Sequence, residues 1–201
     1  STWGTLVQQP LAILIDVNSA HLSGGPVSVA VQVLDSTGAT VAVTAKDSDG
    51  VQYTASYVGL DGPWHRFTLN LAGAAEGAVS IEAAATDSTG NTGIASTTVT
   101  VDRTVPVFRI TAPIPPVGLG SAKVRVSTSE LLAGAPVLVA LDASGSEILV
   151  TGSTRIGQAY EYTLAIDATT AAGVATITAS GRDLAGNPAA AGASLIVDSV
   201  A

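Results

Sequence analysis

Two aspartates stand in the same short pattern, Asp-x-x-Gly-Asn, once at Asp87 and again at Asp183. In a turn, an aspartate carboxylate accepts hydrogen bonds from backbone amides a few residues ahead, and glycine or asparagine accommodates a positive φ. Alternating residues follow each pattern, which is typical of the second strand of a hairpin. We therefore predict that each aspartate closes its own hairpin turn through backbone amides.

A second group of candidate residues is aromatic and gathers in the first half of the chain. A ring exposed on a β-sheet stacks well against sugar rings or a partner protein. Alternation over residues 64–71 puts Trp64 outward and His65 inward beside Phe67. The competing interpretation is that these rings lie in the core, as the few aromatics of such domains commonly do. The candidate ligand-binding residues are Trp64, Tyr53, Tyr57 and His65.

No arrangement of residues indicates catalysis. The sequence has two histidines, His21 and His65, and neither belongs to a Gly-x-Ser-x-Gly or His-Glu-x-x-His motif. Cysteine is absent, which excludes disulfides, thiolate metal sites and cysteine nucleophiles. We expect no enzymatic activity and no required cofactor.

The segments that contain these residues are repeated along the chain. The two patterned aspartates are 96 residues apart (183 − 87), and so are Asp102 and Asp198 (198 − 102), which end the strands that follow. A chain of 201 residues is long enough for two domains of about 100 residues each. The predicted domains are 1–102, with an N-terminal extension over 1–10, and 103–201.

The first domain is also predicted to carry a longer middle insert. The turns at Asp35 and Asp142 look equivalent, yet they are 107 residues apart (142 − 35), eleven more than the closing hairpins. The stretch between Tyr53 and Trp64 is the natural place for these extra residues, so the aromatic candidates would lie in the insert.

Short alternating segments bounded by turn residues make up most of the chain. Val27, Val29 and Val31 share one face of a strand, and Lys123 and Arg125 point outward from another. About seven such strands in each copy, and no helical period, predict an all-β fold. That fold is two tandem antiparallel β-sandwiches.

Charge and hydropathy narrow the partners. Sixteen acidic residues against eight basic ones give a net charge of −8, which opposes binding to nucleic acid and anionic lipid. No continuous apolar run approaches 18 residues, so no membrane insertion is expected. Methionine is absent and the chain begins with Ser1, which favours a fragment or a mature form.

Three motifs carry a family resemblance: the Asp-x-x-Gly-Asn turns, Ser129-Glu130 before a Val-rich strand, and the joining segment from Asp102 to Pro106. With them the chain resembles the bacterial immunoglobulin-like (Big-type) domains of extracellular proteins, over essentially its whole length. The resemblance implies two immunoglobulin-like sandwiches in tandem, with neighbouring domains of the same polypeptide as partners. It also implies a bacterial cell-surface or secreted location, as in adhesins.

The resemblance leaves several functions open. The leading expectation is a non-enzymatic structural or adhesive segment that acts as a spacer or presenting module. Alternatives are a module that binds a glycan or surface protein through the aromatic insert, and an accessory region of a secreted hydrolase. Some similar domains bind Ca²⁺ where modules meet, because a hard cation bridges carboxylates. The candidate calcium ligands are Asp87, Asp102 and Asp183, with turn capping as the competing role.

Overall fold

The computed structural model describes residues 9–36 and 38–200, and the predicted N-terminal extension lies almost entirely outside them. The chain divides into two compact units, Ser1–Arg103 (unit 1) and Thr104–Ala201 (unit 2). The division falls one residue after the predicted boundary, because Arg103 donates hydrogen bonds to the carbonyls of Leu71, Ala72 and Ala74 in unit 1. No helix among the described residues is long and apolar enough to cross a membrane.

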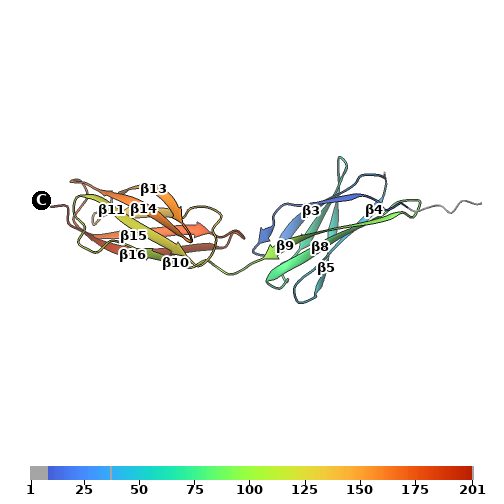
Figure 1. The fold of residues 1–201 in the computed structure, drawn as a ribbon, viewed down its shortest axis with the longest axis horizontal. Helices are drawn as coiled ribbons and strands as arrows, with labels where there is room; N and C mark the ends of the chain where they lie inside the picture. Colours follow the sequence, from blue (N-terminus) through green and yellow to red (C-terminus); the bar gives the residue numbers. More distant parts are fainter. Residues whose placement is uncertain (1–8, 37, 201) are drawn as a thin grey trace, which may run out of the picture. The chain divides into compact units, whose positions relative to one another are not determined.

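Unit 1 is a sandwich of two sheets (Figure 1). One sheet has the strand order β1-β3-β7-β6, and the other has the order β2-β9-β8-β4-β5. All neighbouring strands pair antiparallel except β2 and β9, which pair in parallel. The strands are β1 (Ile13–Val17), β2 (His21–Leu22), β3 (Pro26–Val33), β4 (Thr40–Lys46), β5 (Gln52–Thr54), β6 (Ser56–Asp61), β7 (Trp64–Asn70), β8 (Gly77–Thr86) and β9 (Thr92–Val101).

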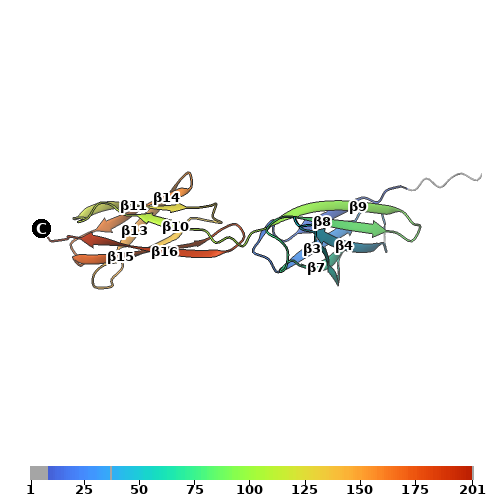
Figure 2. The ribbon, with the colours of Figure 1, turned by 90° about the horizontal axis from the view of Figure 1, so that it is seen from below.

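Unit 2 repeats the plan with sheets β10-β11-β14-β13 and β12-β15-β16. In Figure 2 the β15–β16 hairpin lies on the side of this unit opposite β11 and β14. The strands are β10 (Phe108–Thr111), β11 (Gly120–Thr128), β12 (Val137–Leu141), β13 (Leu149–Ile156), β14 (Ala159–Ile166), β15 (Gly173–Arg182) and β16 (Pro188–Val197). The predicted all-β fold of two antiparallel sandwiches is confirmed.

Each sandwich buries one face of each sheet. In unit 1 the core contains Val27, Val29 and Val31 from β3 and Leu69 from β7. In unit 2 one side of β14 is buried, including Tyr160, Tyr162, Leu164 and Ile166. These burial patterns follow from the alternation of side chains along a strand, since every second residue faces the opposite sheet.

The two units share one register over their first sheets. Leu69 pairs with Val27, and Leu164 pairs with Ala122, so both partners are shifted by 95 residues (164 − 69 and 122 − 27). Ile13 pairs with Val33 and Phe108 with Thr128 at the same shift (108 − 13 and 128 − 33). Over the closing hairpins the shift is 96, because Gly77 and Gly173 both begin the penultimate strand (173 − 77).

This register corrects the predicted insert in unit 1. The counterpart of Asp142 is Asp47 (142 − 47 = 95), whose turn makes the same hydrogen bonds, and the equivalence with Asp35 is wrong. From there to the closing turn, unit 1 has 40 positions (87 − 47) and unit 2 has 41 (183 − 142). The pattern Asp-Ser-x-Gly begins at both Asp35 and Asp47. Only the spacing along the chain shows which of the two turns is equivalent to the turn at Asp142.

Candidate functional site

The Asp-x-x-Gly-Asn patterns form the predicted hairpin corners, one in each unit. Asp87 Oδ1 accepts from the backbone amides of Thr89 and Asn91, both at 2.9 Å, and Oδ2 accepts from Asn91 Nδ2 at 2.9 Å. Asp183 uses Asn187 in the same way, at 2.8 Å from its amide and 2.7 Å from its side chain. Turn capping by both aspartates is thus confirmed. In each corner the glycine has the positive φ, and the asparagine closes the corner with its side chain.

A second kind of corner was missed in the sequence. Asp47 and Asp142 also cap their own turns, but their Oδ2 atoms accept backbone amides from a distant loop. The donors are Ala75, at 3.0 Å from Asp47, and Ala171, at 2.8 Å from Asp142. Each carboxylate therefore joins the end of β4 or β12 to the loop that precedes β8 or β15. The repeated spacing of 95 between two Asp-x-x-Gly turns was the signal that could have identified this pair.

Hydrogen bonding lowers the pKa of three corner carboxylates, Asp47, Asp87 and Asp142, since each bond favours the charged form. The amide of Ala171 and the hydroxyl of Ser144 lower the pKa of Asp142 to about 2. The Asn91 side chain and the Thr89 hydroxyl lower the pKa of Asp87 to about 2. A carboxylate held ionised in this way is a structural clamp at neutral pH, without a proton to give to a reaction.

The calcium candidates do not form a cluster within either unit. Asp87 and Asp102 flank the two ends of β9, which has ten residues and is about 33 Å long, so they cannot share one ion. In each unit taken by itself, the described residues bring no three carboxylate or imidazole ligand atoms within 4.8 Å of one another. Calcium takes about six to eight oxygens. Asp87 therefore belongs to no three-ligand cluster among the described residues of unit 1.

Of the aromatic candidates, the structure brings Tyr57 and His65 together. Their ring centroids are 6.1 Å apart, and Tyr57 packs edge-on against Phe67 at 5.3 Å. Tyr57 is 54% exposed, His65 is half-buried and Phe67 is buried. A ring that rests on a buried neighbour and leaves its other side in solvent is a pre-ordered contact for an apolar or sugar surface.

Two hollows flank His65 and enlarge this candidate site. One, of about 350 Å³, lies between His65, Tyr57 and the start of β4. The other, of about 470 Å³, lies between His65, Pro63 and the end of β3. The exposed leucines Leu34 and Leu60 border the second hollow. The arrangement provides apolar contact beside an exposed aromatic ring, which suits the binding of an apolar or sugar surface.

The other two aromatic candidates lie apart from this pair. Tyr53 is on β5 in the opposite sheet, packs against the core and donates its hydroxyl to Asp47 Oδ2 at 3.0 Å. Burial and this carboxylate raise the pKa of Tyr53. Trp64 is half-buried instead of fully outward, at the tip of the β6–β7 hairpin opposite Asp61. Tyr53 is therefore structural, Tyr57 and His65 share one contact surface, and a binding role for Trp64 stays a prediction.

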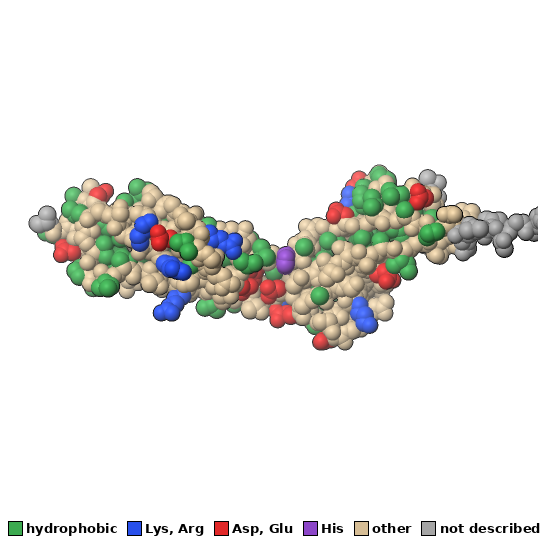
Figure 3. Space-filling model, viewed as in Figure 1, with side chains coloured by type: hydrophobic (Ala, Val, Ile, Leu, Met, Phe, Trp, Pro, Cys, Tyr) green, Lys and Arg blue, Asp and Glu red, His purple; other side chains and the backbone are tan. Residues whose placement is uncertain are grey.

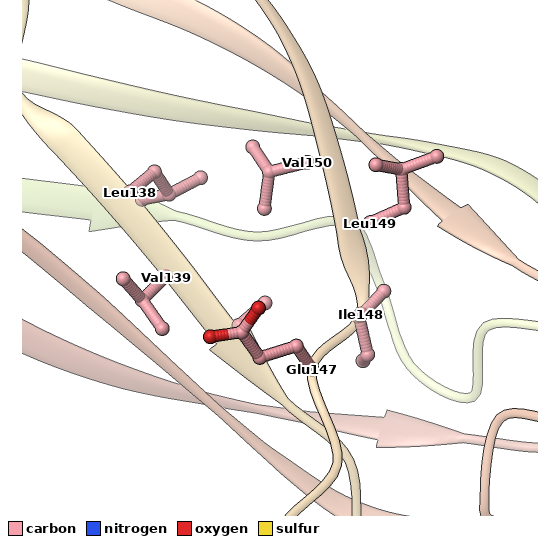
Figure 4. Close-up of a pocket in the computed structure, with 7 residues that line it drawn as sticks. Leu138, Val139, Glu147, Ile148, Leu149 and Val150 are labelled. Atoms are coloured by element: carbon pink, nitrogen blue, oxygen red, sulfur yellow. The ribbon is translucent and has the colours of Figure 1, made fainter.

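Unit 2 has a hollow of about 390 Å³ between the edges of β12 and β13 (Figure 4). The Ile148 amide donates to the Ala140 carbonyl at 2.8 Å at the point where the two edges meet, and the edges diverge beyond it. Glu147 provides the one carboxylate of the lining, and the remaining side chains are aliphatic. This hollow is a gap at the open side of a sandwich, without the residues of an active site.

Comparisons with known proteins bear on the fold. No family model and no curated protein matches the chain. Among solved structures, a 1.5-MDa bacterial ice-binding adhesin is 17% identical with a TM-score of 0.50, over 97% of this chain and 67% of that one. An I-band fragment of titin is 15% identical with a TM-score of 0.51, over 95% of this chain and 66% of that one. Both units are immunoglobulin-like sandwiches.

A tetra-tandem repeat from the extending region of a large adhesion protein is also similar. It is 24% identical with a TM-score of 0.43, over 94% of this chain. The present chain spans about half (49%) of that structure's length. At these identities the likeness concerns the immunoglobulin-like fold, and any activity has to be argued from the chain's own residues.

Proposed function

We propose that this chain is a non-enzymatic, load-bearing tandem segment of a larger extracellular protein, in which it spaces or presents neighbouring domains. The location at a bacterial cell surface and the kinship with Big-type domains belong to the same proposal. It is supported by the immunoglobulin-like fold and by the bacterial ice-binding adhesin among the similar structures, whose structure gives insight into its host cell surface retention. The observation that carries it is the path of the chain through each unit.

In unit 1 the chain enters at one end of the last strand and leaves at the other. The Leu11 amide donates to the Thr92 carbonyl at 3.0 Å, so the chain enters beside the start of β9. It leaves after Val101, where β9 ends. In unit 2 the carbonyl of Thr104 accepts from Asn187, just before β16, and the chain leaves after Val197. Each unit therefore advances the chain by the length of a ten-residue strand, as a spacer requires.

When the two ends of a unit are pulled apart, the tension acts on specific hydrogen bonds of its last strand. In unit 1 the amides of Thr100 and Asp102 donate to the carbonyls of Ala20 and Leu22, both at 2.8 Å, in the parallel pair β2–β9. In unit 2, Val117 makes the corresponding parallel bridge to Val197. These bonds run across the strands, and tension along the strands shears them together. We expect them to resist force in proportion to their number.

A single-molecule pulling experiment tests this function. Thr100→Pro removes the amide that bonds Ala20, on the edge of β9 that faces away from β8. We expect the unfolding force of unit 1 to fall while unit 2, in the same molecule, keeps its force. Thr98→Pro is the matched control, because it lies on the same edge two residues outside the β2 pairing. Equal forces in the wild type and Thr100→Pro would contradict the load-bearing role.

Ligand binding by unit 1 is a second candidate function, favoured by the exposed Tyr57 ring beside His65. The ligand would be a glycan or a surface protein that covers the two hollows. Tyr57→Ala should abolish binding on a glycan array or in partner pull-downs, while Tyr53→Phe should keep it because that hydroxyl serves Asp47. If neither variant changes the binding profile, this candidate is wrong.

Calcium binding stays a prediction for Asp87, Asp102 and Asp183. If it occurs, a chelator lowers the melting temperature of the full chain, and Asp183→Asn reduces that difference. Identical melting curves with and without calcium would contradict it.

The role of accessory region in a secreted hydrolase also stays a prediction. The identity of the neighbouring domains in the same polypeptide would test it.

A further inference from the structure

A cluster of cations covers the outer face of one sheet in unit 2. Arg109 on β10 and Lys123 and Arg125 on β11 are all exposed and point away from the core. Figure 3 shows Lys and Arg side chains gathered on the surface of this unit, with an acidic side chain among them. We call Arg109, Lys123 and Arg125 the basic face.

The basic face has an excess of positive charge. Glu161 on the neighbouring strand β14 bonds Lys123, with Nζ 2.9 Å from Oε1. Among the described residues, neither Arg109 nor Arg125 forms an ion pair. Three cations and one carboxylate leave a local charge of +2, whereas unit 2 as a whole has five basic and seven acidic residues, or −2. The positive charge is thus concentrated on one sheet against the sign of the unit.

The fold does not require these charges. At the shift of 95 residues, the equivalent positions in unit 1 are Leu14, Ser28 and Ala30 (109 − 14, 123 − 28 and 125 − 30), on the same strands of the same sheet. Lys123 and Arg125 are two residues apart on one strand, about 7 Å. Arg109 is a diagonal neighbour of Arg125, about 7–8 Å away. Like charges at such distances repel, so the cluster slightly destabilises the folded unit. A cluster that does not stabilise the fold suggests a role in binding.

We propose that the basic face binds an acidic polysaccharide through the carboxylate or sulfate groups of successive sugars. Two guanidinium groups can each hold an oxyanion in a bidentate manner, and the ammonium of Lys123 adds a point charge. Hydroxyls of Thr111, Ser127 and Thr163 border the cations and suit the hydroxyls of a sugar chain. A flat sheet with separated cations fits an extended polymer with repeated charges better than a small enclosed ligand.

Binding should be local and sensitive to salt. The chain carries −8 overall, so attraction acts only within a screening length of about 8–10 Å from the basic face. This inference rests on the extracellular role proposed above, but the two are tested separately. The pulling experiment concerns strand pairing, whereas polysaccharide binding concerns three exposed side chains.

The test uses the full chain and the residues that unit 1 has at the same positions. The variant Arg109→Leu, Lys123→Ser, Arg125→Ala removes the basic face. The matched control Lys46→Ser, Arg66→Ala, Arg182→Ala removes three exposed or half-buried cations elsewhere and changes the net charge equally. Binding to heparin, polygalacturonate, double-stranded DNA and neutral dextran is measured by titration calorimetry at low and physiological salt, after circular dichroism confirms folding.

We expect binding to one or both acidic polymers, no binding to dextran, and a loss of at least about tenfold in the basic-face variant only. Heparin alone would identify sulfate as the recognised group, and polygalacturonate alone would identify carboxylate. The proposal is overturned if the basic-face variant binds as tightly as the wild type, if the control loses as much, or if double-stranded DNA binds equally well. A gain of binding on transfer to the two exposed positions of unit 1, with Leu14→Arg and Ser28→Lys, would support it from the opposite direction.

Discussion

The two units have nearly the same interior and different exteriors. On the inner side of their first sheets, Val29 and Val31 in unit 1 correspond to Val124 and Val126 in unit 2, and all four are almost fully buried. On the outer side of the same strands, the exposed Ser28 in unit 1 corresponds to the exposed Lys123 in unit 2. Burial constrains the inner residues to one volume and polarity, whereas solvent accepts almost any side chain. We therefore expect functional differences between the two units to lie on their outer surfaces.

The largest effects should come from breaking the shared interior. Leu69 and Leu164 are equivalent and 0% exposed, so Leu69→Ala and Leu164→Ala should each destabilise their own unit by about 2–5 kcal/mol, through lost burial and a cavity. Hydrogen exchange measured by mass spectrometry on the full chain resolves the two units. The outward substitutions Thr68→Ala and Thr163→Ala should stay within about 0.5 kcal/mol. A large effect from an outward substitution would break the comparison.

A second expected effect concerns a position where the interiors differ. Gly93 begins the packing of β9 against the entering chain, and a Cβ there would lie 2.3 Å from the Leu11 carbonyl oxygen. Its counterpart in unit 2 is Ala189 (189 − 93 = 96). Gly93→Ala should destabilise unit 1 by about 1–3 kcal/mol through overpacking, measured by denaturant unfolding. The reverse change, Ala189→Gly, should cost less than about 1 kcal/mol, from backbone entropy alone.

Acid should weaken both units in the same window. The folded pKa of Asp87 and of Asp142 is about 2, below the ordinary value of 3.8, so their bonds add stability above pH 4. That stability is lost as the pH falls through the folded pKa, between about pH 4 and pH 2. Melting temperatures over this range should fall steeply in the wild type. Unchanged melting temperatures down to pH 2 would contradict the role of these carboxylates.

The two kinds of corner should respond unequally to loss of charge. Asp142→Asn removes the acceptor of the Ala171 amide and separates a strand end from a distant loop. Asp87→Asn disturbs bonds only within its own turn. We expect the larger drop in melting temperature at pH 7 from Asp142→Asn. The opposite order would show that local turn closure matters more than the link between strands.

The smallest effect should come from the outer face of unit 2. Lys123 and Glu161 form an exposed ion pair, and such pairs contribute about 0.2–1 kcal/mol. Lys123→Ser, which copies Ser28 of unit 1, should therefore change the stability of unit 2 by less than about 1 kcal/mol in urea unfolding. A larger loss would mean that the basic face serves folding and would weaken the case for a ligand.

Several features were predictable because they depend on local patterns. Alternation identified the buried side of β3, and the Asp-x-x-Gly-Asn spacing identified both closing hairpins. The middle of unit 1 was less predictable, because Asp35 and Asp47 begin similar letter patterns and the wrong one was matched to Asp142. Tyr53 was grouped with Tyr57 by nearness in sequence, yet β5 and β6 belong to different sheets.

The sequence by itself determined two consecutive β-sandwiches, their closing turns and the polarity of most strand positions, because a period of two and a repeated spacing are local properties. The tertiary structure decided what depends on contacts between distant segments. It linked Asp142 to Ala171, set the Tyr57 ring on Phe67, and joined Arg109 with Arg125 on one face. Strand pairing brings such residues together across long intervals of the chain, and no pattern along the chain records which strands will be neighbours.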